Sequence, residues 1–170
     1  MKKLALSILV FITLCTTLCA CSSYTAQDGY KVVASDSCSF CFDVPSDWEI
    51  TYTDTMLAAN DPADKSNVVG FAVDTQEVMG ADNYWETYKQ NYEETFGQIN
   101  ITEFSETSLD GVIARKVVFD ITIDDVSYTC QTIICSRYNT IHTLTFTSLN
   151  TNYQTHKEQF DTIASTFRFV

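Results

Sequence analysis

The chain has 170 residues and is strongly acidic: 22 Asp and Glu against 10 Lys and Arg give a formal net charge of −12. Such a charge repels nucleic acid and anionic lipid headgroups, so neither is expected to bind the body of the protein. The length suits a single domain that buries about 70% of its unfolded surface.

The first residues have the pattern of an export signal. Met1-Lys2-Lys3 carries two positive charges, and an apolar run extends from Leu4 to Leu14. That run is too short to span a bilayer, which needs about 20 apolar residues. A charged start followed by a short apolar run is typical of a secretory signal peptide.

The run is followed by Leu18-Cys19-Ala20-Cys21. This segment resembles the lipobox of bacterial lipoproteins, although Cys19 departs from the residue usual at its position. The resemblance implies cleavage before Cys21 and acylation of its thiol. Residues 1–20 would then be the signal peptide and 21–29 a lipidated tether on the extracytoplasmic side of the cell membrane. The alternatives are a plain secretory signal cut near Ala20 and an uncleaved apolar anchor.

The first part of the body is rich in β-type residues. Tyr30 to Val44 reads as extended chain, and Phe40, Phe42 and Val44 alternate onto one face. A turn at 45–47 leads into Trp48–Tyr52. By composition, residues 60–67 form a loop before a buried-strand run at Val68–Val73.

Two amphipathic helices are expected. The first extends from Asp82, a suitable N-cap, to Phe96, and Gly97 follows as a C-terminal stop. The second extends from Asn152 to Thr166, and Thr151 to Gln154 has capping-box spacing. Their apolar stripes consist of Trp85, Tyr88, Tyr92 and Phe96 in the first helix, and of Tyr153, Phe160, Ile163 and Phe167 in the second.

Between the helices lie four β segments joined by short turns. The three turns are Asp110-Gly111, Asp124-Asp125 and Tyr138-Asn139. Connections this short require antiparallel neighbours. The segments are Ile99–Leu109, Val112–Ile123, Val126–Ser136 and Thr140–Ser148. The fold class is therefore α+β, with an antiparallel sheet covered by two main helices.

Two local sequences suggest a family. Val44-Pro45-Ser46-Asp47-Trp48 and Ile163-Ala164-Ser165-Thr166-Phe167, in this order of elements, resemble the PsbP/Mog1 superfamily and in particular bacterial PsbP-like lipoproteins. The resemblance covers roughly Val32 to Phe169. It implies an α/β/α sandwich over residues 30–170 and a non-enzymatic scaffold that docks on another molecule. No functional residue of the superfamily can be matched to this chain, so its partners do not transfer.

Four cysteines fall in the body: Cys38, Cys41, Cys130 and Cys135. On a strand, Cys38 and Cys41 would lie about 10 Å apart and on opposite faces, too far apart for a disulfide between them. Tight turns, which structural zinc sites favour, are not expected there. Buried free thiols, cross-strand disulfides and a metal site all remain open.

The sequence contains no catalytic signature. Its two histidines, His142 in a strand and His156 on the exposed side of the last helix, adjoin no nucleophile motif. Asp61-x-x-Asp64 lacks the spacing of a calcium-binding loop and allows at most a weak surface site. No catalytic residue, resident metal or cofactor is therefore predicted.

The leading hypothesis is a membrane-anchored binding or accessory module for a protein partner or a small ligand. The alternatives are an unrecognised envelope enzyme, either a hydrolase or a thiol redox protein, and a purely structural envelope protein. A redox role would need an exposed cysteine of low pKa.

Overall fold

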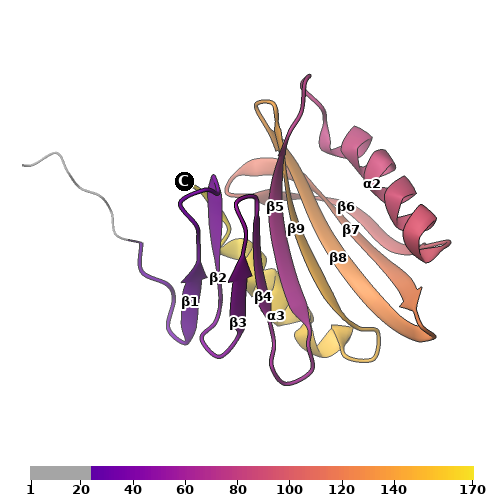
Figure 1. Cartoon of the computed structure of the whole chain (residues 1–170), viewed down its shortest axis with the longest axis horizontal. Helices are drawn as coiled ribbons and strands as arrows, with labels where there is room; N and C mark the ends of the chain where they lie inside the picture. Colours follow the sequence, from indigo (N-terminus) through magenta and orange to yellow (C-terminus); the bar gives the residue numbers. More distant parts are fainter. Residues whose placement is uncertain (1–23) are drawn as a thin grey trace, which may run out of the picture.

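The computed structural model describes residues 24–170, so the predicted signal peptide and Cys21 lie outside the described residues. Its centre is a seven-stranded antiparallel sheet with the strand order β3-β4-β5-β9-β8-β7-β6 (Figure 1). The strands are β3 (Glu49–Tyr52), β4 (Met56–Asn60), β5 (Asn67–Asp74), β6 (Asn100–Leu109), β7 (Val112–Ile123), β8 (Val126–Arg137) and β9 (Thr140–Leu149).

A helix packs on each face of this sheet, as the sequence predicted. Helix α2 (Ala81–Phe96) covers β7 and β8 on one face, where Trp85 packs against Phe119. Helix α3 (Tyr153–Ser165) lies on the other face, where Phe160 stacks on Phe146 of β9. The predicted stripes are confirmed: their residues are buried, or half-buried against the core in the case of Tyr92 and Phe96. The architecture is an α/β/α sandwich.

The sequence did not predict a second, smaller sheet, which shares the face covered by α3. It consists of β1 (Tyr30–Val33), β2 (Phe40–Pro45) and β10 (Arg168–Phe169), in the order β1-β2-β10. The extended run predicted for Tyr30–Val44 is therefore an antiparallel hairpin, interrupted at residues 34–39. Cys38 lies in that connection and not on a strand. Strand β10 escapes prediction because its two residues pair with β2, about 125 positions earlier in the chain.

Glycine allows β2 to lie close against β5. A Cβ built on Gly70 would come within 2.7 Å of Phe40 and 3.0 Å of Phe42. The aromatic rings of β2 therefore occupy the space that a side chain on β5 would need. This contact joins the small sheet to the large one within a single core.

The meander forms with the predicted turns. Asp110, Asp124, Asp125 and Tyr138 all have positive φ at the hairpin ends, as tight hairpin turns require. Strand β4 was missed because residues 56–60 have no alternating pattern and include two alanines in place of β-branched or aromatic residues. Antiparallel pairing with β3 on one side and β5 on the other makes this segment a strand.

Both helices begin differently from the prediction. Gly80, not Asp82, is the N-cap of α2, and Asp82 instead binds Arg115 at 2.6 Å. Asn152 caps α3 without a side-chain hydrogen bond to the helix, because its Oδ1 accepts from the Thr151 hydroxyl at 3.1 Å while its NH₂ donates to Asp64. The predicted capping box is therefore wrong, since the Thr151 hydroxyl bonds to the neighbouring side chain and not to the helix backbone. Within residues 24–170, no helix has the length and apolar character needed to cross a membrane.

Candidate functional site

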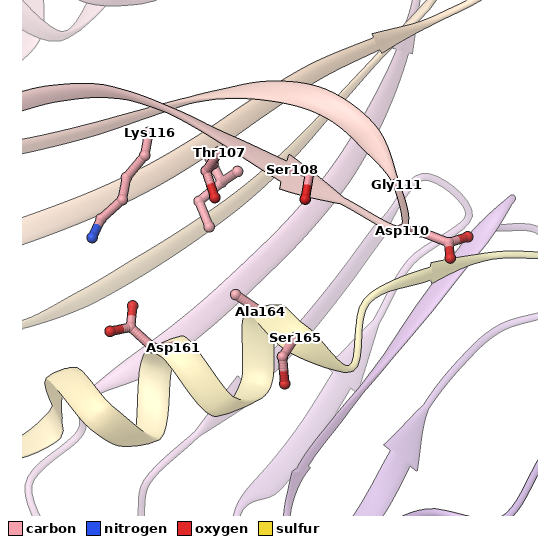
Figure 2. A pocket seen from close by; sticks show the side chains of 9 residues that line it. Thr107, Ser108, Asp110, Gly111, Lys116, Asp161, Ala164 and Ser165 are labelled. Carbon is pink, nitrogen blue, oxygen red and sulfur yellow. The ribbon is translucent and has the colours of Figure 1, made fainter.

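A groove of about 480 Å³ lies between the β6–β7 hairpin and α3 (Figure 2). Lys116 of β7 and Asp161 of α3 lie on its two walls. Ile133 of β8, the strand next to β7, also lines it. The remaining lining residues are Thr107, Ser108, Asp110, Gly111, Ala164 and Ser165.

Both charged walls are positioned by ion pairs. Lys116 Nζ lies 3.4 Å from Glu103 Oε1 on the neighbouring strand. Asp161 Oδ2 accepts a hydrogen bond of 2.6 Å from Lys157, one helical turn earlier. Burial opposes ionisation of Asp161, but the hydrogen bonds from Lys157 and Gln131 outweigh it and lower its pKa. The groove thus presents a fixed ammonium opposite a fixed carboxylate.

A buried polar chain supports the Asp161 side of the groove. Tyr153 donates to Gln131 Oε1 at 2.7 Å, and the Gln131 amide donates to Asp161 Oδ1 at 3.3 Å. Gln131 is fully buried, and burial is the main reason that the pKa of Tyr153 rises to about 12. A satisfied buried network of this kind fixes the side chain at its end. Sequence reasoning missed it, although a glutamine inside an apolar strand was a usable signal.

The groove has the size and polarity of a small-ligand site. Its volume lies in the range of such sites, about 300–1,000 Å³. Its charged groups are one lysine, Lys116, and two carboxylates, those of Asp110 and Asp161, and the lining residues include neither histidine nor cysteine. The Asp161 carboxylate is held ionised, so it is a poor general acid at neutral pH.

The four body cysteines are buried free thiols in the described chain. Cys130 and Cys135 lie on opposite faces of β8, in separate core clusters. Burial raises the pKa of Cys130 to about 11 and that of Cys135 to about 12, and it also raises the pKa of Cys38 and Cys41. Thiol redox chemistry requires the opposite environment, exposed and with a low pKa.

The structure brings one serine to a histidine. Ser39 Oγ lies 3.2 Å from His142 Nε2, and the imidazole packs edge-on against Phe40 and Phe169. Burial, the largest cause, lowers the pKa of His142. Within residues 24–170, however, no carboxylate hydrogen-bonds the ring to complete a triad, and neither residue lines any of the four cavities described. The pair is therefore better explained by packing than by hydrolysis.

His156 is not on the exposed side of its helix, which corrects the sequence prediction. It stacks on Phe160, and its Nε2 lies 2.7 Å from Asp64 Oδ2. Asp61 lies beside them, and the ligand atoms of all three residues are within 4.8 Å of one another. The Asp61-x-x-Asp64 loop is thus joined to α3 by a histidine that no local spacing could reveal.

A fully buried acid, Asp43, joins the ends of the described chain. Asp43 of β2 has no exposed surface and accepts hydrogen bonds from Tyr24 at 2.6 Å and from Arg168 at 3.3 Å. The Arg168 guanidinium also lies over the Tyr24 ring, 3.1 Å from its centre. Residue 24, which lies in the segment predicted as the tether, is therefore held against β2.

The fold is that of the PsbP/Mog1 proteins. The solution structure of the cyanobacterial PsbP protein (CyanoP) from Synechocystis sp. PCC 6803 matches with a TM-score of 0.68 and 12% identity, covering 90% of this chain and 99% of that one. LpqN of Mycobacterium tuberculosis, involved in cell envelope biogenesis, matches with a TM-score of 0.59 and 13% identity, over 85% of this chain and 87% of its own.

The Ran-binding protein Mog1p of Saccharomyces cerevisiae shares the same architecture. Its TM-score is 0.59 at 9% identity, covering 83% of this chain and 95% of that one. No family model and no curated protein sequence matches this chain. At such low identities the likeness establishes the fold, as predicted, and leaves the role to be argued from the residues.

Proposed function

We propose that this chain is a lipoprotein anchored through Cys21 on the extracytoplasmic side of the membrane. Its folded domain would act there as a non-enzymatic binding module. The groove between the β6–β7 hairpin and α3 is the observation that carries the binding role. It offers space, fixed opposite charges and supporting hydrogen bonds, without a catalytic group of suitable pKa.

The groove favours a ligand that is polar and carries both signs of charge. Lys116 would receive a carboxylate or phosphate, and Asp161 would receive an amine or an amide N–H. An extended peptide segment of a partner protein meets this description, as does a small zwitterion.

The position of Tyr24 links the groove to the anchor. Tyr24 follows Cys21 by three positions, a span of at most about 11 Å. Tyr24 contacts Arg168, and the neighbouring Phe169 N–H donates to Asp110 on the groove wall at 3.0 Å. A lipid on Cys21 would therefore keep one end of the groove near the membrane surface, where a membrane-bound partner could reach it.

The similar structures support this proposal at the level of the fold. They comprise a PsbP protein, a protein involved in cell envelope biogenesis and a Ran-binding protein. LpqN in particular connects this fold with the cell envelope.

Substitutions at two nearby cysteines, Cys19 and Cys21, test the lipid anchor. In detergent phase separation of expressing cells, the full-length protein and Cys19→Ala should enter the detergent phase, and Cys21→Ala should not. The Cys19→Ala variant controls for any general effect of changing the signal region. Equal partitioning of the two variants would overturn the lipoprotein assignment.

The groove is tested by cross-linking in intact cells. A photoreactive residue at Ser165, on the groove wall, should capture a partner, and Lys116→Ala combined with Asp161→Ala should abolish that capture. The matched control places the photoreactive residue at Glu86, which is exposed on α2. Native mass spectrometry of the protein in detergent extends the test to small ligands. Capture that is equal at both positions, together with a ligand-free mass, would refute a binding role for the groove.

A further inference from the structure

Asp61, Asp64 and His156 converge from two separate segments, the β4–β5 loop and the first half of α3. Two Asx-type turns hold the acids in place: Asp61 Oδ1 accepts from the Ala63 N–H at 2.8 Å, and Asp64 Oδ1 accepts from the Ser66 N–H at 3.0 Å. The other oxygen of Asp64 faces His156 and Asn152. The other oxygen of Asp61 is left by its turn for a further partner. Two like charges this close repel each other unless a cation lies between them.

The hydrogen bonds of His156 pose a specific question. Its Nδ1 lies 3.2 Å from Gln159 Oε1 and its Nε2 lies 2.7 Å from Asp64 Oδ2, so both ring nitrogens face an acceptor oxygen. A neutral imidazole carries one N–H and can satisfy only one of them. In the metal-free protein a second ring proton satisfies the second contact, and a cation bound between Nε2 and the carboxylate would replace that proton.

The contact geometry suits a shared metal ion. Two ligands of one Zn²⁺ at about 2.0–2.1 Å each lie about 2.9 Å apart at octahedral angles and about 3.3 Å apart at tetrahedral ones. Nε2 and Oδ2 are 2.7 Å apart, so a separation larger by a few tenths of an ångström would admit the ion. The bond from His156 Nδ1–H to a glutamine oxygen is the outer-shell contact that orients metal-bound histidines. The Asn152 side-chain amide donates a hydrogen bond of 2.9 Å to Asp64 Oδ2. A carboxylate oxygen has two lone pairs, so the second one can bind the metal ion.

Independent support for a ligand near Asp64 comes from a buried hydroxyl that has no hydrogen-bond partner. Asp64 and Ser148 both line a cavity of about 200 Å³ next to the β4–β5 loop. Ser148 is only 2% exposed, and its Oγ has no hydrogen-bond partner. A buried hydroxyl without a partner is costly, and a metal-bound water in this cavity would supply one.

We propose that Asp61, Asp64 and His156 bind one divalent transition-metal ion of the zinc class, with water completing its coordination. Two carboxylates and a neutral imidazole around a 2+ ion give a site with no net charge. The mixed oxygen and nitrogen donors favour Zn²⁺, Co²⁺ or Mn²⁺ over calcium, which prefers oxygen alone. Because the site lies at the start of α3, it is independent of the role proposed for the groove.

The test uses the full-length protein purified in detergent and stripped of metal with a chelator. Zinc is titrated by calorimetry, and cobalt is followed by visible absorption. One equivalent should bind, without the thiolate absorption that cysteine ligands would produce. Asp61→Asn keeps the turn acceptor but loses the charged ligand, so zinc affinity should fall at least tenfold while the melting temperature in chelator stays unchanged.

Two further variants complete the test. His156→Gln should weaken zinc at least tenfold, and Gln159→Leu, which removes the outer-shell acceptor, should weaken it by about tenfold. Asp47→Asn, an exposed acid elsewhere, should leave affinity unchanged. The proposal fails if no saturable one-to-one binding occurs at micromolar zinc. It also fails if Asp61→Asn and His156→Gln bind zinc as well as the unmodified protein.

Discussion

Individual buried polar residues hold together parts of this chain that are distant in sequence. Asp43 is the clearest case, because its carboxylate receives both Tyr24 from the start of the described chain and Arg168 from its end. Breaking a buried ion pair by removing one partner leaves the other charge uncompensated. The sequence Phe-Cys-Phe-Asp-Val-Pro already contained this signal, since an acid inside an apolar run needs a buried partner.

Asp43→Ala is therefore expected to lower the free energy of unfolding by about 3–5 kcal/mol. Urea denaturation measures this change. Asp47→Ala, an exposed acid in the adjoining turn, serves as the control and should stay within about 0.5 kcal/mol of the unmodified protein. A loss below about 1 kcal/mol for Asp43→Ala would mean that the pair adds little to stability.

His142 should make stability depend on pH. Burial and the nearby Arg137 lower its pKa in the folded state, against the opposing influence of the Thr140 backbone and Asp74. The unfolded chain therefore binds the proton at a higher pH than the folded chain does. The contribution of His142 is complete above about pH 6.5 and is lost as the pH falls below it.

The measurement compares urea denaturation of the unmodified protein and His142→Phe between pH 7.5 and 5.5, with chelator present. All other titrating groups are common to both proteins, so the difference between their curves reports His142. The unmodified protein should lose stability on acidification relative to the variant, by up to about 1.4 kcal/mol per pH unit. Parallel curves would show that the imidazole titrates normally in the folded protein.

At the scale of elements, the contact between β2 and β5 determines how the small sheet joins the large one. Gly70→Ala would place a methyl group 2.7 Å from a Phe40 ring carbon and 3.0 Å from one of Phe42. Either the rings or the strand must move, and overpacking of this kind costs about 1–3 kcal/mol.

The expected loss is measured by thermal or urea denaturation of Gly70→Ala. Gly80→Ala is the matched control, since an added Cβ there meets nothing within 4 Å and its φ of −74° suits any residue. The control should lose well under about 1 kcal/mol. Equal losses for the two variants would contradict a special packing role for Gly70.

At the scale of the whole molecule, the cysteines report on the integrity of both core layers. Cys135 belongs to the core under α3 and Cys130 to the core under α2. Neither thiol can be reached without opening the sheet at its centre. Thiol labelling of the native protein should therefore be slower than that of the unfolded chain by a factor on the order of 10³ or more at these two positions.

Cys38 should label faster, because it lies in the connection before β2, which can open locally. Mass spectrometry of peptides after timed alkylation resolves the four positions. Rapid, stoichiometric labelling of Cys130 or Cys135 in the native protein would contradict the buried assignment. It would also revive the thiol redox alternative.

Local patterns predicted the main layers of the fold. The aromatic stripe from Trp85 to Phe96 and the stripe from Tyr153 to Phe167 gave both helices. The turns at Asp110, Asp124 and Tyr138 gave the meander, because helical periodicity and hairpin turns depend on residues close in sequence. Strands β4 and β10 could not be predicted in this way, because neighbours that are distant in the sequence make them strands.

The same division holds for the sites. The sequence by itself determined the acidic character, the two amphipathic helices and the antiparallel meander, since each depends on composition or short-range spacing. The export signal and the anchor at Cys21 stay predictions, because they lie outside the described residues, and the sandwich architecture followed from the family resemblance. Only the tertiary structure placed Lys116 opposite Asp161, His156 against Asp64 and Arg168 on Asp43. Each of these contacts joins segments separated by tens of residues or more, and their distance is determined by how the layers pack.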